Sequence, residues 1–161
     1  MIRNLKVCLV VFTALTCLMY AGQNVVNLSA AYNFVADVVT MSNQVVYPAS
    51  FGPSIHSPFL IWLLLGVIVA LEFTAGLLAA RGALDLWKTR HAGADEFNNA
   101  KKFAILGCGM ALVIWFGLFM SVGGAYFQMW QTELGAAALE GAFQIATLNG
   151  IVLLFINAPD A

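Results

Sequence analysis

The sequence predicts an all-α membrane protein, a four-transmembrane-helix bundle with both chain termini in the cytoplasm. Three observations predict this class. The 161 residues are 61% hydrophobic and only 9% charged, whereas about a quarter of the residues in a soluble domain are charged. Four apolar runs of about 18 to 22 residues are each long enough for a helix to cross a hydrocarbon core of ~30 Å. All seven basic residues fall on one side of such a bundle.

The first apolar run, residues 5–22, follows Arg3 and Lys6 and is expected to be the first span. A basic start followed by an apolar stretch also occurs in signal peptides. No small-x-small cleavage site follows here, because Met19 or Tyr20 would occupy the position three residues before the cut. We therefore expect this segment to be retained as a membrane helix.

The other spans are expected at residues 59–80, 103–122 and 139–156. The second follows the helix-breaking sequence PSIHSP at 53–58, and the third follows Lys101 and Lys102. The fourth ends at Asn157 and Pro159. Residues 1–161 are therefore expected to form a single membrane domain.

The positions of the basic residues predict the orientation of the bundle. Two precede the first span, five lie between the second and third spans, and the loops 23–58 and 123–138 contain none. Lysine and arginine concentrate in cytoplasmic loops, so both termini are expected inside. The five loop residues either set topology alone or also contact anionic lipid headgroups, at about 1 kcal/mol each. They are Arg81, Lys88, Arg90, Lys101 and Lys102.

The long first outer loop contains the pattern of a short amphipathic helix. Ser29 is a suitable N-cap, and apolar residues recur after it at helical spacing. Such a helix is either a lid over the ends of the spans or a docking surface for a partner. The apolar positions are Ala31, Phe34, Val35, Val38 and Met41.

The second outer loop reads GGAYFQMWQTELG at 123–135. Tyr126, Phe127 and Trp130 are expected in the aromatic belt at the membrane interface. The third helix is expected to continue to about Thr132 and to end before Gly135. A predicted outer docking interface combines these aromatic side chains with Phe34 and Met129.

Two outer segments resemble a known family. YNFVADVVTMS at 32–42, GAYFQMWQT at 124–132 and the glutamate of the second span are similar to an uncharacterised bacterial family of predicted small four-span integral membrane proteins, a domain family of unknown function. The resemblance implies four spans in the bacterial inner membrane and implies no activity. Family members tend to have a glutamate before the aromatic pair, but this chain has Ala125, so no acidic role is expected there.

The fourth span carries a seam of small residues at every fourth position. Lipid gives helices little hydrophobic reason to associate, so small residues that let backbones approach favour packing. We expect this seam to face a neighbouring helix inside the bundle. Its members are Ala138, Ala142, Ala146 and Gly150.

Glu72 is the acidic residue expected deep in the membrane, about 4 Å past the midpoint of the second span at ~1.5 Å per residue. An ionised group at that depth costs at least ~2.5 kcal/mol. One interpretation is a polar clasp, in which Glu72 hydrogen-bonds Asn149 of the fourth span with Thr13 and Thr16 nearby. The others are contact with a lipid or quinone headgroup, and ion translocation. The lack of further ionisable groups at depth favours the clasp.

The sequence has no recognisable catalytic set, metal pair or phosphate-binding loop. The net charge of −1 provides no basic surface for nucleic acid. We therefore expect no enzyme activity and no cofactor or metal, while a bound lipid or quinone remains compatible with the pattern.

The expected function is a non-catalytic accessory subunit or interaction protein of a bacterial inner-membrane complex, such as a respiratory or other energy-transducing one. Its expected partners are membrane lipids and other integral membrane subunits. Two alternatives are a small channel or transporter that uses Glu72, and a lipid- or quinone-binding protein with an apolar groove near Glu72 and Asn149.

Overall fold

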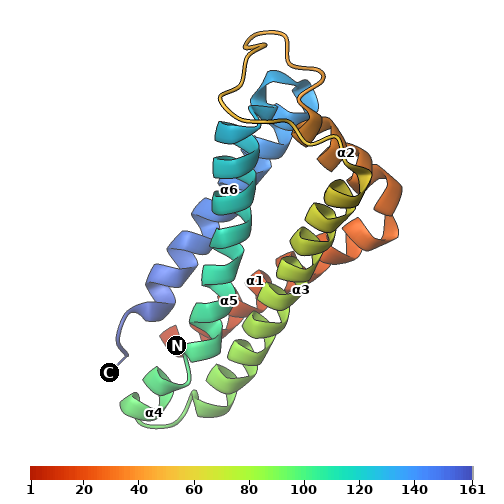
Figure 1. Ribbon diagram of the computed structural model, residues 1–161. Helices are drawn as coiled ribbons and strands as arrows, with labels where there is room; N and C mark the ends of the chain where they lie inside the picture. Colours follow the sequence, from red (N-terminus) through yellow and green to blue (C-terminus); the bar gives the residue numbers. More distant parts are fainter. Residues whose placement is uncertain (161) are drawn as a thin grey trace.

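The computed structural model describes residues 1–160, and every regular element within them is a helix (Figure 1). Four helical segments are long and apolar enough to cross a membrane. They are α1 (Ile2–Val26), α3 (Pro58–Thr89), the segment Ala94–Tyr126, and α6 (Glu133–Asn157). The predicted all-helical architecture with four membrane spans is therefore confirmed.

The helices are longer than the apolar runs that predicted them. α3 continues to Thr89 through residues that were expected in a loop. The third span is built from α4 (Ala94–Asn99), α5 (Lys102–Leu112) and the π-helical segment η1 (Val113–Tyr126). Both ends of the chain lie at the end of the bundle that also carries the turn between α3 and α4 (Figure 1). We call it the terminal end, and the opposite end, with residues 41–57, the loop end.

At the terminal end, α3 and α5 approach closely because each presents very small residues to the other. A Cβ atom added at Gly107 would lie 2.5 Å from the backbone nitrogen of Ala79. One added at Gly82 would lie 2.2 Å from the backbone nitrogen of Ala104. Small residues at such contacts let two helix backbones pack directly against each other. The two helix backbones are therefore in direct contact in this part of the bundle.

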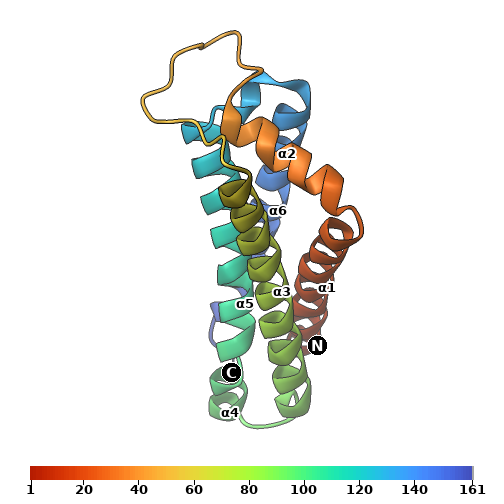
Figure 2. The same cartoon turned by 45° about the vertical axis from the view of Figure 1, so that its right-hand side comes forward.

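Toward the loop end, α3 packs much less extensively on η1 than it does on α5. A further helix, α2 (Leu28–Thr40), leaves the end of α1 and runs obliquely across this region (Figure 2). Its residues Val35 and Val39 are buried in a cluster with Ile61, Leu65 and Phe127. A helix therefore occupies the segment where the sequence pattern indicated one, although Asn27 and not Ser29 stands at its N-cap.

The third span ends earlier than its sequence indicated. η1 stops at Tyr126, and Gln128 follows with a φ of 52°. A short 3₁₀ turn, η2 (Met129–Gln131), then leads into α6, whose N-cap Thr132 accepts a hydrogen bond of 3.1 Å from the backbone nitrogen of Gly135. The expected continuation to Thr132 with a break at Gly135 is therefore wrong. The left-handed conformation at Gln128 ends the helix, and Gly135 belongs to the first turn of α6.

The contact of α3 with α5 predicts that Gly107→Ala destabilises the bundle. The added methyl group would collide with the backbone of Ala79, and overpacking of this kind costs about 1–3 kcal/mol. Gly109→Ala is the matched control, because nothing lies within 4 Å of a Cβ atom at that position. Thermal unfolding in detergent measures both variants. Equal melting temperatures for the two would contradict the close contact.

Candidate functional site

Glu72 lies inside the bundle, with only 1% of its surface exposed. Its Oε2 accepts a hydrogen bond of 2.9 Å from Nδ2 of Asn24. Asn24 stands in the last turns of α1, and the close contact of α1 with α3 brings it opposite the middle of α3. A buried carboxyl group needs such a partner, because a buried polar group without a hydrogen bond is costly. Asn24 is thus a site residue that the sequence did not reveal.

The predicted clasp between Glu72 and Asn149 is wrong. Asn149 is buried in α6, but its Nδ2 donates a hydrogen bond of 2.9 Å to the carbonyl oxygen of Ile145 in the same helix. Its Oδ1 has no hydrogen-bond partner among residues 1–160. Equal depth did not imply contact, because α3 packs mainly on α1 and α5, whereas α6 packs mainly on α5 and η1.

The two threonines of α1 do not bond to Glu72 within the part of the chain that the structure describes. Thr13 is buried, and its hydroxyl lies 4.0 Å from the thiol of Cys108. Thr16 is half-buried. The predicted polar set of the spans therefore separates into different places along the bundle.

The small-residue seam of α6 faces inward. Ala142 and Ala146 are buried and belong to a cluster with Ala111 and Trp115, while Ala138 and Gly150 are half-buried. This is the side of α6 that packs on the third span.

An apolar cavity of about 140 Å³ lies between α2, α3 and η1. Its walls include Val38 of α2, Ile68 of α3 and Phe119 of η1. Asn24 is the only residue with a polar side chain among those that line it, and no lysine, arginine or histidine takes part. Asn24, which is hydrogen-bonded to Glu72, is therefore the polar point in the wall of a space that is otherwise hydrocarbon-like.

The residues of the predicted outer interface have different environments. Phe127 and Met129 are 7% and 3% exposed, so their prediction as docking contacts is wrong. The chain reverses at Gln128 and turns both side chains into the bundle. Phe34 is half-buried and lines the cavity. Trp130 is exposed and packs edge-on against Tyr47.

Tyr126 and two glutamines connect the segment 41–57 to the bundle. The hydroxyl of Tyr126 donates a hydrogen bond of 3.2 Å to the carbonyl oxygen of Pro53. Oε1 of Gln131 accepts hydrogen bonds of 2.9 and 2.7 Å from the backbone nitrogens of Val46 and Tyr47. Nε2 of Gln44 donates to the carbonyl oxygen of Phe127. The sequence gave no signal for these long-range contacts.

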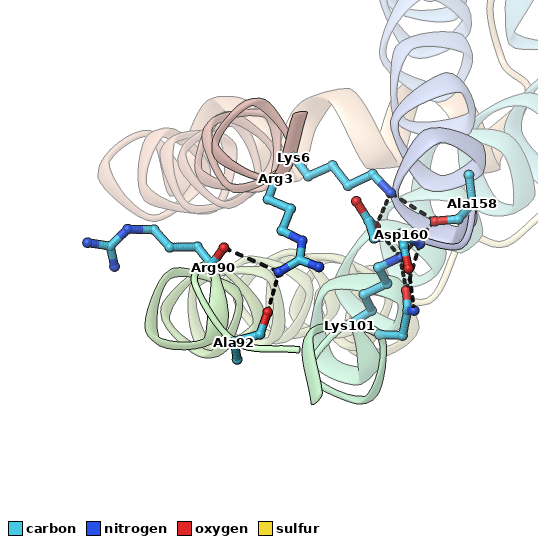
Figure 3. A network of polar contacts seen from close by, with 8 residues as sticks. Arg3, Lys6, Arg90, Ala92, Lys101, Ala158 and Asp160 are labelled. Atoms are coloured by element: carbon cyan, nitrogen blue, oxygen red, sulfur yellow. Dashed lines mark hydrogen bonds and ion pairs between the residues drawn. The ribbon is translucent and has the colours of Figure 1, made fainter. Parts of the chain in front are cut away.

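At the terminal end, two buried lysines share one carboxylate (Figure 3). Oδ2 of Asp160 lies 2.5 Å from Nζ of Lys6 and 2.5 Å from Nζ of Lys101. The carbonyl oxygen of Ala158 also accepts hydrogen bonds from both lysines, at 2.8 and 2.7 Å. Asn98 accepts from the backbone nitrogen of Asp160 at 3.0 Å. The group of Lys6, Lys101 and Asp160, here the terminal lock, joins α1, the start of α5 and the segment after α6.

Burial raises the pKa of the Asp160 carboxyl, but hydrogen bonds from Lys101 and Lys6 and their positive charges outweigh it, so the pKa lies below its ordinary value. The ionised form of Asp160 is therefore the one that holds the lock together.

The lysines and arginines that were predicted to contact lipid have different environments: one is buried and the others lie on the surface or half-buried. Lys101 is only 3% exposed and paired with Asp160, so its prediction as a headgroup contact is wrong. The ion pair satisfies its charge inside the protein. Arg81 pairs with Asp85 at 3.0 Å on the surface, and Arg90 lies over the ring of Trp87. Lys88 and Lys102 are exposed and border a surface cleft between α3 and α5.

These features define the class of the protein as a small helical integral membrane protein with four spans. No group of three or more His, Cys, Asp or Glu side chains suited to a metal ion occurs in residues 1–160. The chain belongs to the family of predicted small integral membrane proteins DUF2165, whose model matches residues 2–159. The family resemblance of the two loop-end segments is thereby confirmed. No curated protein and no solved structure shows a match.

The hydrogen bond between Asn24 and Glu72 predicts different outcomes for two substitutions. Glu72→Gln keeps an acceptor for Asn24 and should leave thermal stability in detergent nearly unchanged. Glu72→Leu leaves the amide of Asn24 without its hydrogen-bond partner and should lower the free energy of unfolding by about 1–3 kcal/mol. The double variant Glu72→Leu with Asn24→Leu should recover most of that loss, because both polar partners are removed. A Leu variant as stable as the wild type would contradict the structural role.

The terminal lock predicts a pH-dependent stability. Asp160→Asn leaves two buried lysines without their counter-ion and should lower the free energy of unfolding by about 3 kcal/mol at pH 7. A carboxyl with a lowered pKa stabilises the fold above its ordinary value of 3.8, and that contribution disappears as the pH falls through the lower folded value. The difference in melting temperature between wild type and variant should therefore shrink below about pH 4.

Asp95→Asn is the control for this comparison, because Asp95 is exposed and lies in the same end of the bundle. It should melt like the wild type at every pH. A wild-type advantage over Asp160→Asn that stays constant down to pH 3 would exclude the ion pair as its source.

Proposed function

We propose that this protein is a non-catalytic interaction protein, an accessory subunit of a complex in the bacterial inner membrane, with both termini in the cytoplasm. In this proposal its partner is another integral membrane subunit that docks on the loop end. The observation that supports it most is an exposed apolar surface on the segment 41–57. We call it the loop-end patch, and its members are Val45, Val46, Tyr47 and Phe51.

The side chains of the loop-end patch are largely exposed. Val45 and Phe51 are 80% and 83% exposed, and Val46 and Tyr47 are more than half exposed. The segment lies beyond the start of α3 and has no regular secondary structure (Figure 1). Exposed apolar side chains gathered in one segment are typical of interaction sites with proteins or membranes.

The patch is held in a defined shape before any partner arrives. Gln131 fixes the backbone at Val46 and Tyr47 through its side-chain amide. The ring of Phe51 packs edge-on against Tyr126, with ring centroids 5.0 Å apart. A surface that is ordered in advance loses less conformational entropy on binding, which favours a specific partner.

The chemistry of the segment favours a protein partner over anionic lipid. Residues 41–57 contain no lysine or arginine, whereas recognition of anionic headgroups depends on basic clusters. The charge distribution also supports the orientation, since the basic residues of the chain gather at the terminal end.

The space beside Glu72 bears on the two alternative functions. A channel that uses Glu72 calls for a polar path, but the cavity at Asn24 is apolar. An apolar site near Glu72 is what a lipid- or quinone-binding protein requires. Ligand binding is therefore the second candidate, and it is compatible with a subunit role.

Site-specific photocrosslinking in intact membranes tests the docking proposal. A photoreactive residue at position 46 should give one discrete protein adduct, and the same residue at position 12 should give lipid adducts, since Phe12 is exposed on the side of α1. Phe51→Ser should reduce the protein adduct by about tenfold, as loss of an interface anchor does. Phe12→Ser is its control. Lipid adducts alone at position 46, with the chain isolated as a monomer, would refute the proposal.

A further inference from the structure

We propose that the cavity between α2, α3 and η1 is a binding site for the uncharged, hydroxyl-bearing head of a membrane amphiphile. The hydroxyl lies at Asn24, whose amide is held by its hydrogen bond to Glu72, and the apolar tail leaves toward the lipid. This site is separate from the loop-end patch, and its test requires no partner docked there.

The dimensions and position of the cavity suit such a head. Its volume of about 140 Å³ is close to the ~150 Å³ of an apolar cavity that holds a benzene-sized molecule. Val67 of α3 and Val122 of η1 both line it, and each is 43% exposed on the surface of the bundle. The cavity therefore reaches the surface that faces lipid, and a tail attached to the head can leave through that side.

The polar point of the cavity wall is Asn24, which is half-buried. Its Nδ2 donates a hydrogen bond to Oε2 of Glu72, so its amide is held in one orientation. Within residues 1–160, the side-chain oxygen Oδ1 of Asn24 accepts no hydrogen bond. One oxygen atom in the wall of an apolar space is therefore open to a donor on a bound molecule.

A hydroxyl group matches this atom better than other head groups. It supplies the one donor that the side-chain oxygen of Asn24 can accept. A phosphate or carboxylate head would find no basic side chain in the lining and would be buried without a counter-charge. An ammonium is charged and has three donors, whereas the lining offers one polar side chain and no carboxylate. The ligand class is therefore a neutral alcohol or phenol, as in a quinol or a glyceride.

The cavity persists because its three walls are held by different contacts. α3 is fixed to α5 at the terminal end through Gly82 and Gly107, and it separates from η1 above that contact. η1 is π-helical, and π-helical segments occur frequently at functional sites. α2 closes the remaining side, anchored by Val39, whose carbonyl oxygen accepts a hydrogen bond of 2.8 Å from the backbone nitrogen of Ile55.

Binding of three synthetic amphiphiles to the purified full chain in detergent tests the site. The probes are decylhydroquinone, its dimethyl ether, which cannot donate a hydrogen bond, and 1-decanoylglycerol, which has hydroxyls without a ring. Saturable rises in melting temperature give their affinities. At least one hydroxyl probe should bind about tenfold or more tightly than the ether, the effect of one lost hydrogen bond at a buried partner. The tighter of the two hydroxyl probes identifies the source as quinol or glyceride.

Substitutions that fill the cavity locate the binding. Val122→Trp should abolish the saturable shift, because the indole occupies the space. Val113→Trp is the matched control, since Val113 is a valine of the same helix, 53% exposed, that does not line the cavity. Val67→Trp fills the cavity from α3 and replaces the first variant if that one does not fold.

The polar end is tested by the double variant Asn24→Leu with Glu72→Leu. It should bind the hydroxyl probe and the ether equally, because no polar partner remains. Three results would each overturn the site: equal binding of ether and hydroxyl probes to the wild type, no saturable binding of any probe, or wild-type affinity in both cavity-filling variants.

Discussion

The direct backbone contact of α3 with α5 is the constraint on which the rest of the bundle depends. Gly82 and Gly107 bring the two helices so close that a single methyl group cannot be added. Two helices that touch at one end and carry larger side chains toward the other must diverge, because the ridges of leucine, isoleucine and phenylalanine need more space. That divergence creates room at the loop end, and α2 occupies part of it (Figure 2). The cavity is what remains.

The two ends of the molecule consequently have different physical character. The terminal end combines close helix packing with the lock of Lys6, Lys101 and Asp160, whose charges are satisfied within the protein. The segment 41–57 at the loop end is held by long-range contacts of single side chains, such as Gln131 with the backbone at Val46. Regions with few buried apolar contacts open at lower free energy than tightly packed ones. Both proposed binding features lie at the loop end, and the terminal end maintains the fold.

The sequence predicted the spans well because each rests on a property that is local along the chain. Apolar length and the positions of basic residues require no knowledge of neighbours. The partner of Glu72 was missed for the opposite reason. The depth of Glu72 in the membrane followed from counting residues. Its neighbours depend on how α1 crosses α3, and that crossing places Asn24 beside Glu72 and Asn149 elsewhere. The predicted first span ended at residue 22, so the sequence placed Asn24 in the outer loop, whereas α1 continues to Val26.

Other features were missed because their causes are not local. Lys101 counted as a topological charge, yet it is neutralised by Asp160, which is 59 positions later by number and near the end of the chain. The sequence VIWFGLFMSVGGAY does not indicate that η1 is π-helical, because an apolar run is compatible with the hydrogen bonds of an α-helix or of a π-helix. The cavity lies where α3 packs sparsely on η1, and that depends on the packing of whole helices, so apolar composition alone could not predict it.

The loop-end patch and the cavity share structural elements, and this has a physical consequence. The backbone of Val39 in α2 holds Ile55 of the segment 41–57, and Gln44 of that segment donates to Phe127, which lines the cavity. A molecule that enters the cavity contacts α2 and Phe127 directly. If the ligand and the docked subunit favour different positions of α2, each must alter the affinity of the other by the same factor, because coupling between two binding sites is reciprocal. The geometry of one short helix would then determine both events.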